Sequence, residues 1–542
     1  MSTHSPGKVV IVGAGVAGAM TAAYLKAAFG DRTEVVLVGF PPAGEPAGHE
    51  STLGDIRDFF DFLGLAEEDW MPACDATCKL AVRVQDWSGP GQYFYLPFEP
   101  ARRAGGFPLT EWWLRQRPSG RFDRDCFVSA WLCDAGRVPR PAADSGPGAD
   151  AAAVPYGYHL DSAALTRLLT RYAAERGAVP LTGDPTDVRL DARGWIECLV
   201  TEEHGEVHGD LFVDCTGERG LLLHRALKVP RVSYRDTLPN DSLVTLEAPA
   251  DMRTRGIPPY TTVTARGAGW MWTVPLFDRI GAGHAYATEY CTPEEAERAL
   301  REHVGPEAAG AAAVHTPLLP GRGAQAWKHN CVAVGASAGR AEPLGTVGDA
   351  SAAHHALERL VRHFPGADWH PRLRAGFNAA TAAALDGERE FATLHYQGAA
   401  RDDTQYWRDA KTLALPGGLA ERLAGWRVLP PGPEHPGDGH RGRPGHAYTS
   451  VLIGTGGAPP RAPAALPLVG DAVALREFAA VRHEAAALTG TSPTGYEYLA
   501  QLGATSPPAD RRSVLSTGQR TRPPQVGEQV FPHRRPDGWR NA

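Results

Sequence analysis

The chain has 542 residues, 43% of them hydrophobic and 22% charged, which suits one large enzyme or two to three globular domains. The formal net charge of −7 argues against nucleic acid as a partner. We expect no signal peptide and no membrane span, and eight scattered cysteines without metal-ligand spacing favour a reduced, cytoplasmic setting and no metal site.

The first predicted elements form a nucleotide-binding unit. Four β-formers at 9–12 lead into Gly-Ala-Gly-Val-Ala-Gly at 13–18, and a helical pattern follows. The first glycine permits a tight turn, the second lets a pyrophosphate approach the backbone, and the third lets the helix pack on the strand. In this strand–turn–helix context the motif predicts a cofactor site at Gly13, Ala14, Gly15, Val16 and Gly18.

The second strand is expected at 33–38. A dinucleotide fold normally ends this strand with Asp or Glu, which binds the adenosine ribose, but here the residue is Gly39. Residues 41–48 are expected as a loop and 55–65 as a short amphipathic helix. Lys79 stands at or just before a strand that alternates from Leu80, and residue type alone favours an exposed lysine there.

The stretch 107–139 is the most aromatic part of the chain. Its rings either line a pocket for a flat substrate or belong to the core, which is the commoner outcome. Residues 142–154 are expected to form a flexible surface loop. A helix over 161–176, capped by Asp161 or Ser162, should follow.

The later chain alternates strands, glycine turns and helices. Strands are expected over 179–217 and 244–290, with further strand-to-glycine turns at 214–220 and 330–339. Helices are expected at 293–303, 350–363, 374–396 and 471–488. Adjacent His354 and His355 should point to different helix faces and make no metal pair. Residues 416–445 are expected to be irregular, and 506–542 to be a disordered tail.

Taken together, these motifs resemble the flavin-dependent tryptophan halogenase family, with the chain as a divergent member. The similarity covers roughly residues 8–505. It rests on the glycine turn at 13–18, Phe-Phe-Asp-Phe-Leu-Gly at 59–64, Lys79 in its strand, Asp-Cys-Thr-Gly-Glu-Arg-Gly at 214–220, Trp-x-Trp-x-x-Pro at 270–275, Arg-Glu-Phe-Ala-Thr-Leu-His-Tyr at 389–396, Asp-Thr-x-x-Trp at 403–407, and Leu-Ile-Gly-Thr-Gly-Gly-Ala-Pro at 452–459.

The resemblance implies an α/β fold with a Rossmann-like FAD-binding unit of the flavin monooxygenase type. Substrate-binding segments would be interleaved with this unit, and the C-terminal part would be helical. We therefore expect an FAD-binding halogenase core at 1–415, a substrate-side region at 416–505, and the tail at 506–542.

The family's chemistry follows by resemblance. Reduced FAD from a separate flavin reductase, oxygen, and chloride or bromide would give a hypohalous acid that travels inside the protein to Lys79. The lysine forms a haloamine or hydrogen-bonds the oxidant, and burial, which lowers a lysine's pKa, would supply the neutral fraction a nucleophile needs. Trp270, Trp272 and Pro275 match the barrier between flavin and substrate.

The substrate would be an electron-rich aromatic ring, namely an indole, phenol or pyrrole, either free or carried on a peptide or carrier. Such reactions belong to secondary metabolism, including antibiotic biosynthesis. Beyond the first glycine turn, the implied cofactor contacts are Glu50, Ser51, Gly217, Gly335 and Gly348, and the implied halide site is Val347 with Gly348.

The chain departs from the family pattern in three places. Members acting on tryptophan usually read Glu-Pro-Leu-Glu-Ser-Thr-Gly, whereas here the second Glu is Gly345 and the Thr is Val347. The ribose acid is Gly39, and the family's Gly-Glu-Ala-Thr run reads Gly-His-Glu-Ser-Thr at 48–52, with a register uncertain by one residue. Glu342 is the candidate catalytic carboxylate, with Glu50 as a second, although Glu342 could simply hold the turn before Pro343.

Two other functions stay open at this stage. A flavin-dependent monooxygenase or oxidase without halogenation is favoured by Gly345 and Val347, and a non-catalytic halogenase-like binding protein is favoured by Gly39. The sequence also leaves open whether the protein is a monomer or a homodimer.

Overall fold

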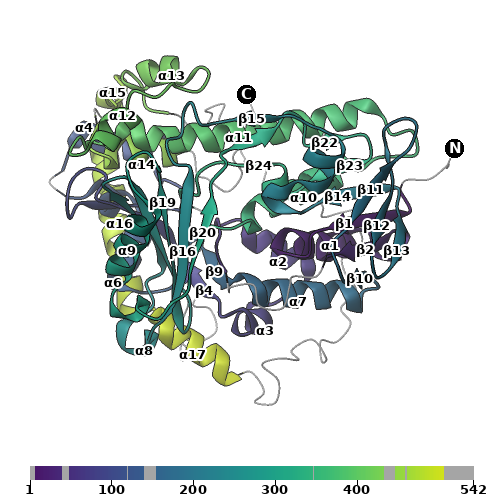
Figure 1. The fold of residues 1–542 in the computed structure, drawn as a ribbon. Helices are drawn as coiled ribbons and strands as arrows, with labels where there is room; N and C mark the ends of the chain where they lie inside the picture. The colour runs from purple at the N-terminus through teal and green to yellow at the C-terminus, as the bar shows by residue number, and fades with distance from the viewer. Residues whose placement is uncertain are drawn as a thin grey trace, which may run out of the picture.

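The computed structural model describes residues 6–39, 48–118, 120–139, 154–345, 347–431, 446–457 and 460–505. Almost all of the loops expected at 41–48 and 142–154, and the whole tail from 506, lie outside these described residues. Figure 1 shows two parts side by side, one built on β1 (Lys8–Val12) and the other on β16 (Ser242–Pro249), with the long helix α11 (Pro371–Gly398) running along the top. The expected mixed α/β class is confirmed.

A mainly parallel sheet forms the nucleotide side. Six strands of the described chain lie in the order β10-β2-β1-β14-β23-β22, and only β22 is antiparallel to its neighbour. Its β-branched runs are buried on both faces because helices α1 and α7 pack together beside it, with α10 against α1. The bounds are β2 Glu34–Val38, β10 Val179–Leu181, β14 Leu211–Asp214, β22 Trp327–Lys328, β23 Cys331–Ala333, α1 Val16–Phe29, α7 Ser162–Glu175 and α10 Ala350–Arg362.

A larger sheet forms the other part. Among the described residues it has seven strands in the order β20-β16-β19-β18-β17-β5-β6, antiparallel except where β17 pairs with β5. Trp270 and Trp272 share one face of β18 because side chains two residues apart point the same way. The other bounds are β5 Ala81–Gln85, β6 Tyr93–Pro97, β17 Tyr260–Arg266, β18 Gly269–Pro275, β19 Arg279–Tyr286 and β20 Ala313–Pro317.

A small sheet carries the main candidate residues. Its order is β3-β9-β4, with β3 at His49–Ser51, β9 at Gly157–Asp161 and β4 at Thr77–Lys79. Lys79 therefore ends one short strand, two residues before β5 begins, and it is fully buried. The surface-lysine interpretation is wrong at this position.

The remaining short strands complete the two parts. They are β7 Arg103–Ala104, β8 Phe107–Pro108, β11 Asp187–Leu190, β12 Ile196–Thr201, β13 Gly205–His208, β15 Arg231–Ser233, β21 Gly321–Gly323 and β24 Gly339–Arg340. The strands expected between 179 and 217 are thus confirmed. Asp161 caps α7, since its carboxylate accepts the amide hydrogen of Ala164.

The C-terminal helices pack onto the aromatic stretch. Helix α16 lies against α6, and α14 lies against β6, so these segments share one core with the early chain. Trp112, Phe122 and Phe127 are buried there, as the core interpretation predicts. Further helices are α2 Ile56–Leu63, α3 Glu67–Trp70, α4 Leu109–Gln116, α5 Phe122–Cys126, α6 Val128–Ala135, α8 Met252–Arg255, α9 Pro293–Val304, α12 Gln405–Ala410, α13 Leu419–Trp426, α14 His446–Gly454, α15 Leu466–Val469, α16 Ala472–Thr491 and α17 Gly495–Thr505.

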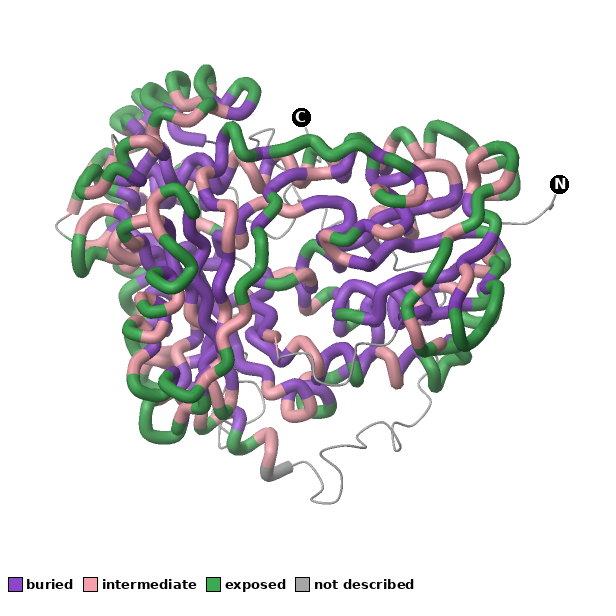
Figure 2. The backbone as a smooth tube through the Cα atoms, viewed as in Figure 1, coloured by how far each residue is buried: buried purple, intermediate pink, exposed green. Residues whose placement is uncertain are grey.

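Helix α13 contradicts the irregular structure expected over 416–445, of which 432–445 lie outside the described residues. Leu419 and Trp426, seven residues apart, are both buried, so tertiary packing stabilises a helix that local composition did not indicate. Figure 2 shows buried segments through the centres of both parts, while α13 is largely exposed. Within the described residues, no helix is long and apolar enough to cross a membrane. The division at 415 stays a prediction.

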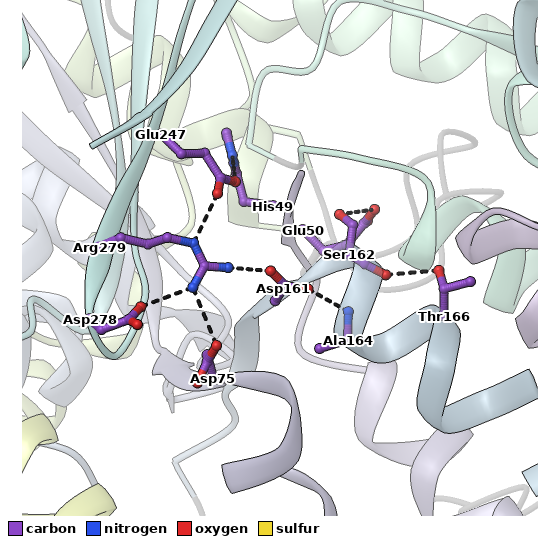
Figure 3. Close-up of polar contacts among 10 residues, drawn as sticks. All are labelled: His49, Glu50, Asp75, Asp161, Ser162, Ala164, Thr166, Glu247, Asp278 and Arg279. Atoms are coloured by element: carbon purple, nitrogen blue, oxygen red, sulfur yellow. Dashed lines mark hydrogen bonds and ion pairs between the residues drawn. The ribbon is translucent and has the colours of Figure 1, made fainter. Parts of the chain in front are cut away.

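One arginine ties the two parts together. Arg279 on β19 donates to Glu247 of β16 at 2.9 Å and to Asp161 at the start of α7 (Figure 3). It also contacts Asp278 at 2.9 Å and Asp75 at 3.3 Å. The arginine side chain is only 15% exposed, and its charge compensates the carboxylates of Asp161 and Glu247, which are 9% and 15% exposed.

Replacing Arg279 with Met should lower the free energy of unfolding by about 3–5 kcal/mol, because partly buried carboxylates would lose their counter-charge. Chemical denaturation would measure this loss. Arg193→Met is the control, since Arg193 is 74% exposed and pairs with Asp191 on the surface. An equal, small effect of both substitutions would contradict a linking role for Arg279.

Candidate active site

The first glycine turn is already shaped for an anion. Gly13 has φ +101°, and a Cβ there would lie 2.4 Å from the carbonyl oxygen of Cys215. A Cβ at Gly18 would lie 1.8 Å from the carbonyl oxygen of Gly13. At Gly15 a Cβ would meet nothing within 4 Å, so this backbone faces open space at the N-terminus of α1. The geometry fits a pyrophosphate, as predicted.

Two further turns lie beside it at the carboxyl ends of neighbouring parallel strands. The buried Asp214 carboxylate at the end of β14 accepts the amide hydrogens of Thr216, Leu222 and Leu223 and the hydroxyl of Thr216. Ser337, just after β23, donates to the same carboxylate at 3.2 Å. The predicted residues Gly217 and Gly335 both adopt positive φ, 62° and 70°, which glycine tolerates.

Asp184 is a residue that the sequence argument missed. A Cβ at Gly39, where a ribose acid was expected, would lie 3.1 Å from the Asp184 carboxylate. Asp184 follows β10, the neighbour of β2, and pairs with Arg219 at 2.8 Å. A carboxylate is therefore present at the end of β2, supplied by the next strand of the sheet. Only the three-dimensional pairing of β10 with β2 brings it there.

A cavity of about 470 Å³ opens between the two parts of the protein. Of the predicted residues it is lined by Glu50, Trp272, Val347 and Gly348. Most of the lining is apolar, with a few polar groups, a composition typical of cofactor sites. The other lining residues include His49, Ser162, Glu247, Arg340 and Pro343. The cavity and the three turns together fit a flavin nucleotide.

Glu50 lies at one end of the cavity. Its carboxylate accepts the amide hydrogen of Ala350 at 2.9 Å, at the start of α10, and the hydroxyl of Ser162 at 3.2 Å. Burial, together with the charge of Asp349, raises the pKa of Glu50 to about 8. A Cβ at Gly348 would lie 2.1 Å from a Glu50 oxygen, so only glycine fits there. The carboxyl group is therefore neutral at pH 7.

Ser51, at the end of β3, pairs with Val347, in the loop between β24 and α10, and so holds that loop in place. Their backbones exchange two hydrogen bonds, of 2.9 Å and 3.1 Å. The Ser51 hydroxyl pairs with Thr261 at 2.6 Å, and Ser51 is not among the residues lining the cavity. The Val347 amide is therefore engaged by the Ser51 carbonyl.

Lys79 contacts the same loop but is not among the residues that line the cavity. Its ammonium donates to the carbonyl oxygens of Thr52 at 2.8 Å and Gly345 at 2.7 Å. The nitrogen is 5.2 Å from the centre of the Phe98 ring. Gly345 has φ +97°, a conformation that favours glycine and turns its carbonyl toward the lysine.

The strand before Lys79 is fixed by a neutral histidine. The Thr77 hydroxyl donates to the carbonyl of Pro275 at 2.7 Å and pairs with His159 at 2.9 Å. Burial and the nearby Lys79 charge hold the pKa of His159 well below its usual range. Pro275 thus acts here through its carbonyl group, as a support for β4.

Trp270 and Trp272 are each held by a specific partner. The Trp270 ring nitrogen donates to Glu342 at 3.0 Å and to the Tyr396 hydroxyl at 3.1 Å. The Trp272 ring nitrogen donates to His49 at 2.9 Å, and the ring centres are 5.6 Å apart. His49 in turn pairs with Glu247 at 3.2 Å (Figure 3).

Glu342 does not lie where a partner of Lys79 was expected. Among described residues its carboxylate is bonded to Asn240, Trp270 and Tyr396, and Lys79 is not one of its hydrogen-bond partners. Burial raises its pKa above the ordinary value. The structure places Glu342 as a hydrogen-bond partner of Trp270, a contact that the sequence did not indicate.

His354 and His355 approach each other more closely than their adjacent positions suggested. One ligand atom from each lies within 4.8 Å of the others in a group with Asp55. His355 pairs with Asp55 at 2.6 Å, and this contact joins α10 to the start of α2. The absence of a metal site stays a prediction.

A family model described as tryptophan halogenase matches residues 8–466, nearly the whole described chain. The chain belongs to the tryptophan halogenase family. It is thus an FAD-dependent oxidoreductase of the flavin-dependent halogenase class, and the expected fold and enzyme class are confirmed.

Several halogenases are similar along almost their full length. Tryptophan 6-halogenase SttH of Streptomyces toxytricini is 53% identical, covering 93% of this chain and 99% of the relative. 7-Chloro-L-tryptophan 6-halogenase KtzR of Kutzneria sp. (strain 744) is 52% identical over 91% and 99%. Such identity shows that the expectation of a divergent family member is wrong.

Solved structures agree with these relatives. The crystal structure of SttH has a TM-score of 0.87, covering 92% of this chain and 99% of that one. Tar14, a tryptophan C-6 flavin-dependent halogenase from taromycin biosynthesis, has a TM-score of 0.87 at 47% identity, with the same coverage.

Gly15→Val should abolish FAD binding without unfolding the protein, because its side chain would enter the open space where a pyrophosphate fits. Flavin fluorescence titration and circular dichroism would measure the two effects. Gly18→Val should instead disrupt the fold, since a Cβ there meets the Gly13 carbonyl. Wild-type FAD affinity in folded Gly15→Val would exclude this site.

Glu50 should carry a proton at neutral pH. The infrared difference between wild type and Glu50→Gln should show a carboxylic acid band that disappears through about pH 8. The associated stability is fully present below the ordinary value near 4.5 and is lost as the pH rises through about 8. Glu34→Gln, at an exposed ion pair with Lys8, is the control. A band that titrates near pH 4.5 would contradict the assignment.

Proposed function

We propose that the protein installs chloride or bromide on carbon 6 of the indole ring of free tryptophan. The observation that carries this proposal is that a single loop contacts both the cavity and Lys79. Pro343, Val347 and Gly348 line the cavity, while Gly345 of the same loop accepts a hydrogen bond from buried Lys79. The position on the ring is proposed from SttH, KtzR and Tar14, whose names all state substitution at position 6.

FAD is proposed to bind with its pyrophosphate at the Gly13–Gly18 turn and its ring system in the 470 Å³ cavity. Asp184 is proposed to take the ribose, in place of the acid missing at Gly39. When bound and reduced by a separate flavin reductase, FAD supplies, with oxygen and halide, a hypohalous acid.

The protein's own groups would hold the halide and orient the lysine. Because Glu50 is neutral, it does not repel an anion at the Gly348 amide and the start of α10. The Thr52 and Gly345 carbonyls fix the Lys79 nitrogen, which is proposed to receive the hypohalous acid by forming a haloamine or donating a hydrogen bond. Trp270, Trp272 and Pro275 are proposed to form the barrier that keeps substrate from the flavin.

Glu342 is proposed as a positioning residue rather than the catalytic carboxylate. Its contacts support Trp270, and Gly345 offers only a carbonyl where family members have glutamate. Since acid–base help is worth about 10²–10⁴ in rate, the substrate should be a ring as reactive as indole. The positive φ of Gly345 also means that a glutamate there would strain the backbone.

A direct assay would test the proposal. The purified protein, FAD, a flavin reductase, NADH, chloride and tryptophan should give a product with the chlorine isotope pattern, and proton NMR should place chlorine at carbon 6. Bromide should substitute for chloride. A hydroxylated product, or flavin turnover with no halogenated product from tryptophan, would overturn the proposal.

Lys79→Ala should abolish halogenation while the reduced flavin is still reoxidised by oxygen, because the lysine acts after the oxidant has formed. Product mass and flavin absorbance would be followed in the same reaction. Lys328→Ala is a matched control, since the Lys328 ammonium also donates to a backbone carbonyl, that of Leu227 at 2.8 Å, far from the loop. Undiminished product from Lys79→Ala would remove the lysine from the mechanism.

A further inference from the structure

A row of buried aromatic residues leads from the barrier to the protein surface. We propose that this row is an electron-transfer chain that carries stray oxidising equivalents out of the active site and so protects the barrier tryptophans. Its members, from the cavity outward, are Trp272, Trp270, Tyr396, Tyr406 and Tyr290.

Short contacts connect the members of the row. The Trp272 and Trp270 rings have centres 5.6 Å apart, and the Trp270 nitrogen is 3.1 Å from the Tyr396 oxygen. The Asn240 amide bridges the two phenols, since it donates to the Tyr396 hydroxyl at 2.9 Å and accepts the Tyr406 hydroxyl at 2.9 Å. Tyr406 and Tyr290 have ring centres 5.6 Å apart. Because electron tunnelling weakens exponentially with distance, such short steps outrun chemical damage at any one ring.

A further aromatic ring packs beside both Tyr396 and Tyr406 in the middle of the row. The Trp407 ring lies 6.0 Å from Tyr396 and 5.3 Å from Tyr406, centre to centre, so it offers a parallel route between the two phenols. These residues belong to α11, which runs along the top of Figure 1, and to α12 at the upper left.

The members of the row are buried except at its outer end, so an electron from solvent can enter the row only there. The first four members are at most 2% exposed, whereas Tyr290, in the connection between β19 and α9, is only partly buried. An oxidising equivalent that starts at Trp272, beside the cavity, would therefore end at a residue that solvent reductants can reach.

A phenol loses its proton when it loses an electron, so an oxidised tyrosine needs a proton acceptor nearby. Two tyrosines of the row have a carboxylate in this position. The Tyr396 hydroxyl donates to Glu342 through a short hydrogen bond, and the Tyr290 hydroxyl donates to Asp409 at 2.7 Å. Burial raises the pKa of Glu342, which makes its carboxylate a better proton acceptor.

Electron transfer along the row is accompanied by proton transfer to and from the two carboxylates. In the absence of halide, the hydrogen peroxide released when reduced flavin meets oxygen would break at its O–O bond to give hydroxyl radicals, and one such radical takes an electron from Trp272 or Trp270 and becomes hydroxide. That tryptophan regains an electron from Tyr396, whose proton passes to Glu342. Tyr396 then takes back its proton from Glu342 and receives an electron through the neighbouring Tyr406 ring.

The last steps deliver the equivalent to the surface. Tyr290 supplies that electron through the Tyr406 and Trp407 rings, while Asp409 takes the proton of Tyr290. A thiol in solution then gives Tyr290 one electron, and the proton on Asp409 returns to it. The net change is one electron moved from the thiol to the radical.

The need for such a chain follows from the barrier itself. Trp270 and Trp272 carry indole rings, the same group that the protein is proposed to halogenate, and Trp272 lines the cavity where the oxidant is proposed to form, with Trp270 packed against it. This inference rests on the proposed function only for the source of the oxidant.

Tyr290→Phe tests the chain, since it keeps the ring but removes the phenol at the surface end. Reduced flavin-loaded protein would be mixed with oxygen in the absence of halide, freeze-quenched for electron paramagnetic resonance, and digested for mass spectrometry. Wild type should show a tyrosyl radical. Tyr290→Phe should lose most of that signal and show a several-fold rise in oxidised Trp270 and Trp272, with an unchanged initial halogenation rate.

Two further variants make the result specific. Asp409→Asn, which removes the proton acceptor, should act in the same direction as Tyr290→Phe. Tyr496→Phe, at a partly buried tyrosine stacked on Phe277 outside the row, should match wild type. Equal tryptophan oxidation in wild type and Tyr290→Phe, or an equal rise in Tyr496→Phe, would overturn the chain. A radical that reaches Tyr290 in a protein that halogenates nothing would leave the chain standing and reject only the proposed function.

Discussion

The buried ammonium of Lys79 is the constraint around which the site is arranged. A charge taken out of water must be compensated, and here two backbone carbonyls, from Thr52 and Gly345, accept its hydrogen bonds. One carbonyl comes from the segment after β3 and the other from the loop before α10. The lysine therefore fixes the distance between two chain segments that also border the cavity, and the loop conformation depends on the positive φ of Gly345.

Trp270 and Trp272 are held by groups that are themselves supported. Glu342 and Tyr396 fix Trp270, and His49 fixes Trp272 through a contact backed by Glu247 and Arg279. Glycines on the neighbouring strand make this possible. A Cβ at Gly283 would lie 2.0 Å from the Trp272 ring, and one at Gly281 would lie 2.3 Å from the His49 ring.

Much of this arrangement could be predicted from the sequence. The strand–turn–helix context of Gly13, Gly15 and Gly18 predicted the cofactor turn, because local backbone geometry alone decides it. Lys79 was identified through resemblance, since neither its residue type nor its short strand distinguishes it from a surface lysine. The helices with strong apolar periodicity also appeared where expected.

The missed features all depend on contacts between distant segments. Asp184 approaches Gly39 only because β10 pairs with β2, and Glu342 reaches Trp270 only because the loop after β24 packs under β18. His49 stood in the run at 48–52 that departs from the family pattern, so this departure was the available signal. Helix α13 depends on burial of Leu419 and Trp426, which the Pro- and Gly-rich composition around it hid.

The central claim is that the oxidant passes from the cavity to Lys79 inside the protein. The most direct test is the yield and position of halogenation of tryptophan in the presence of a large excess of a hypohalous acid scavenger, such as a thioether too bulky for the cavity. The account predicts unchanged yield at carbon 6, because the oxidant never enters bulk solvent. Loss of product as scavenger is added would show that the oxidant leaves the protein, and would contradict the account.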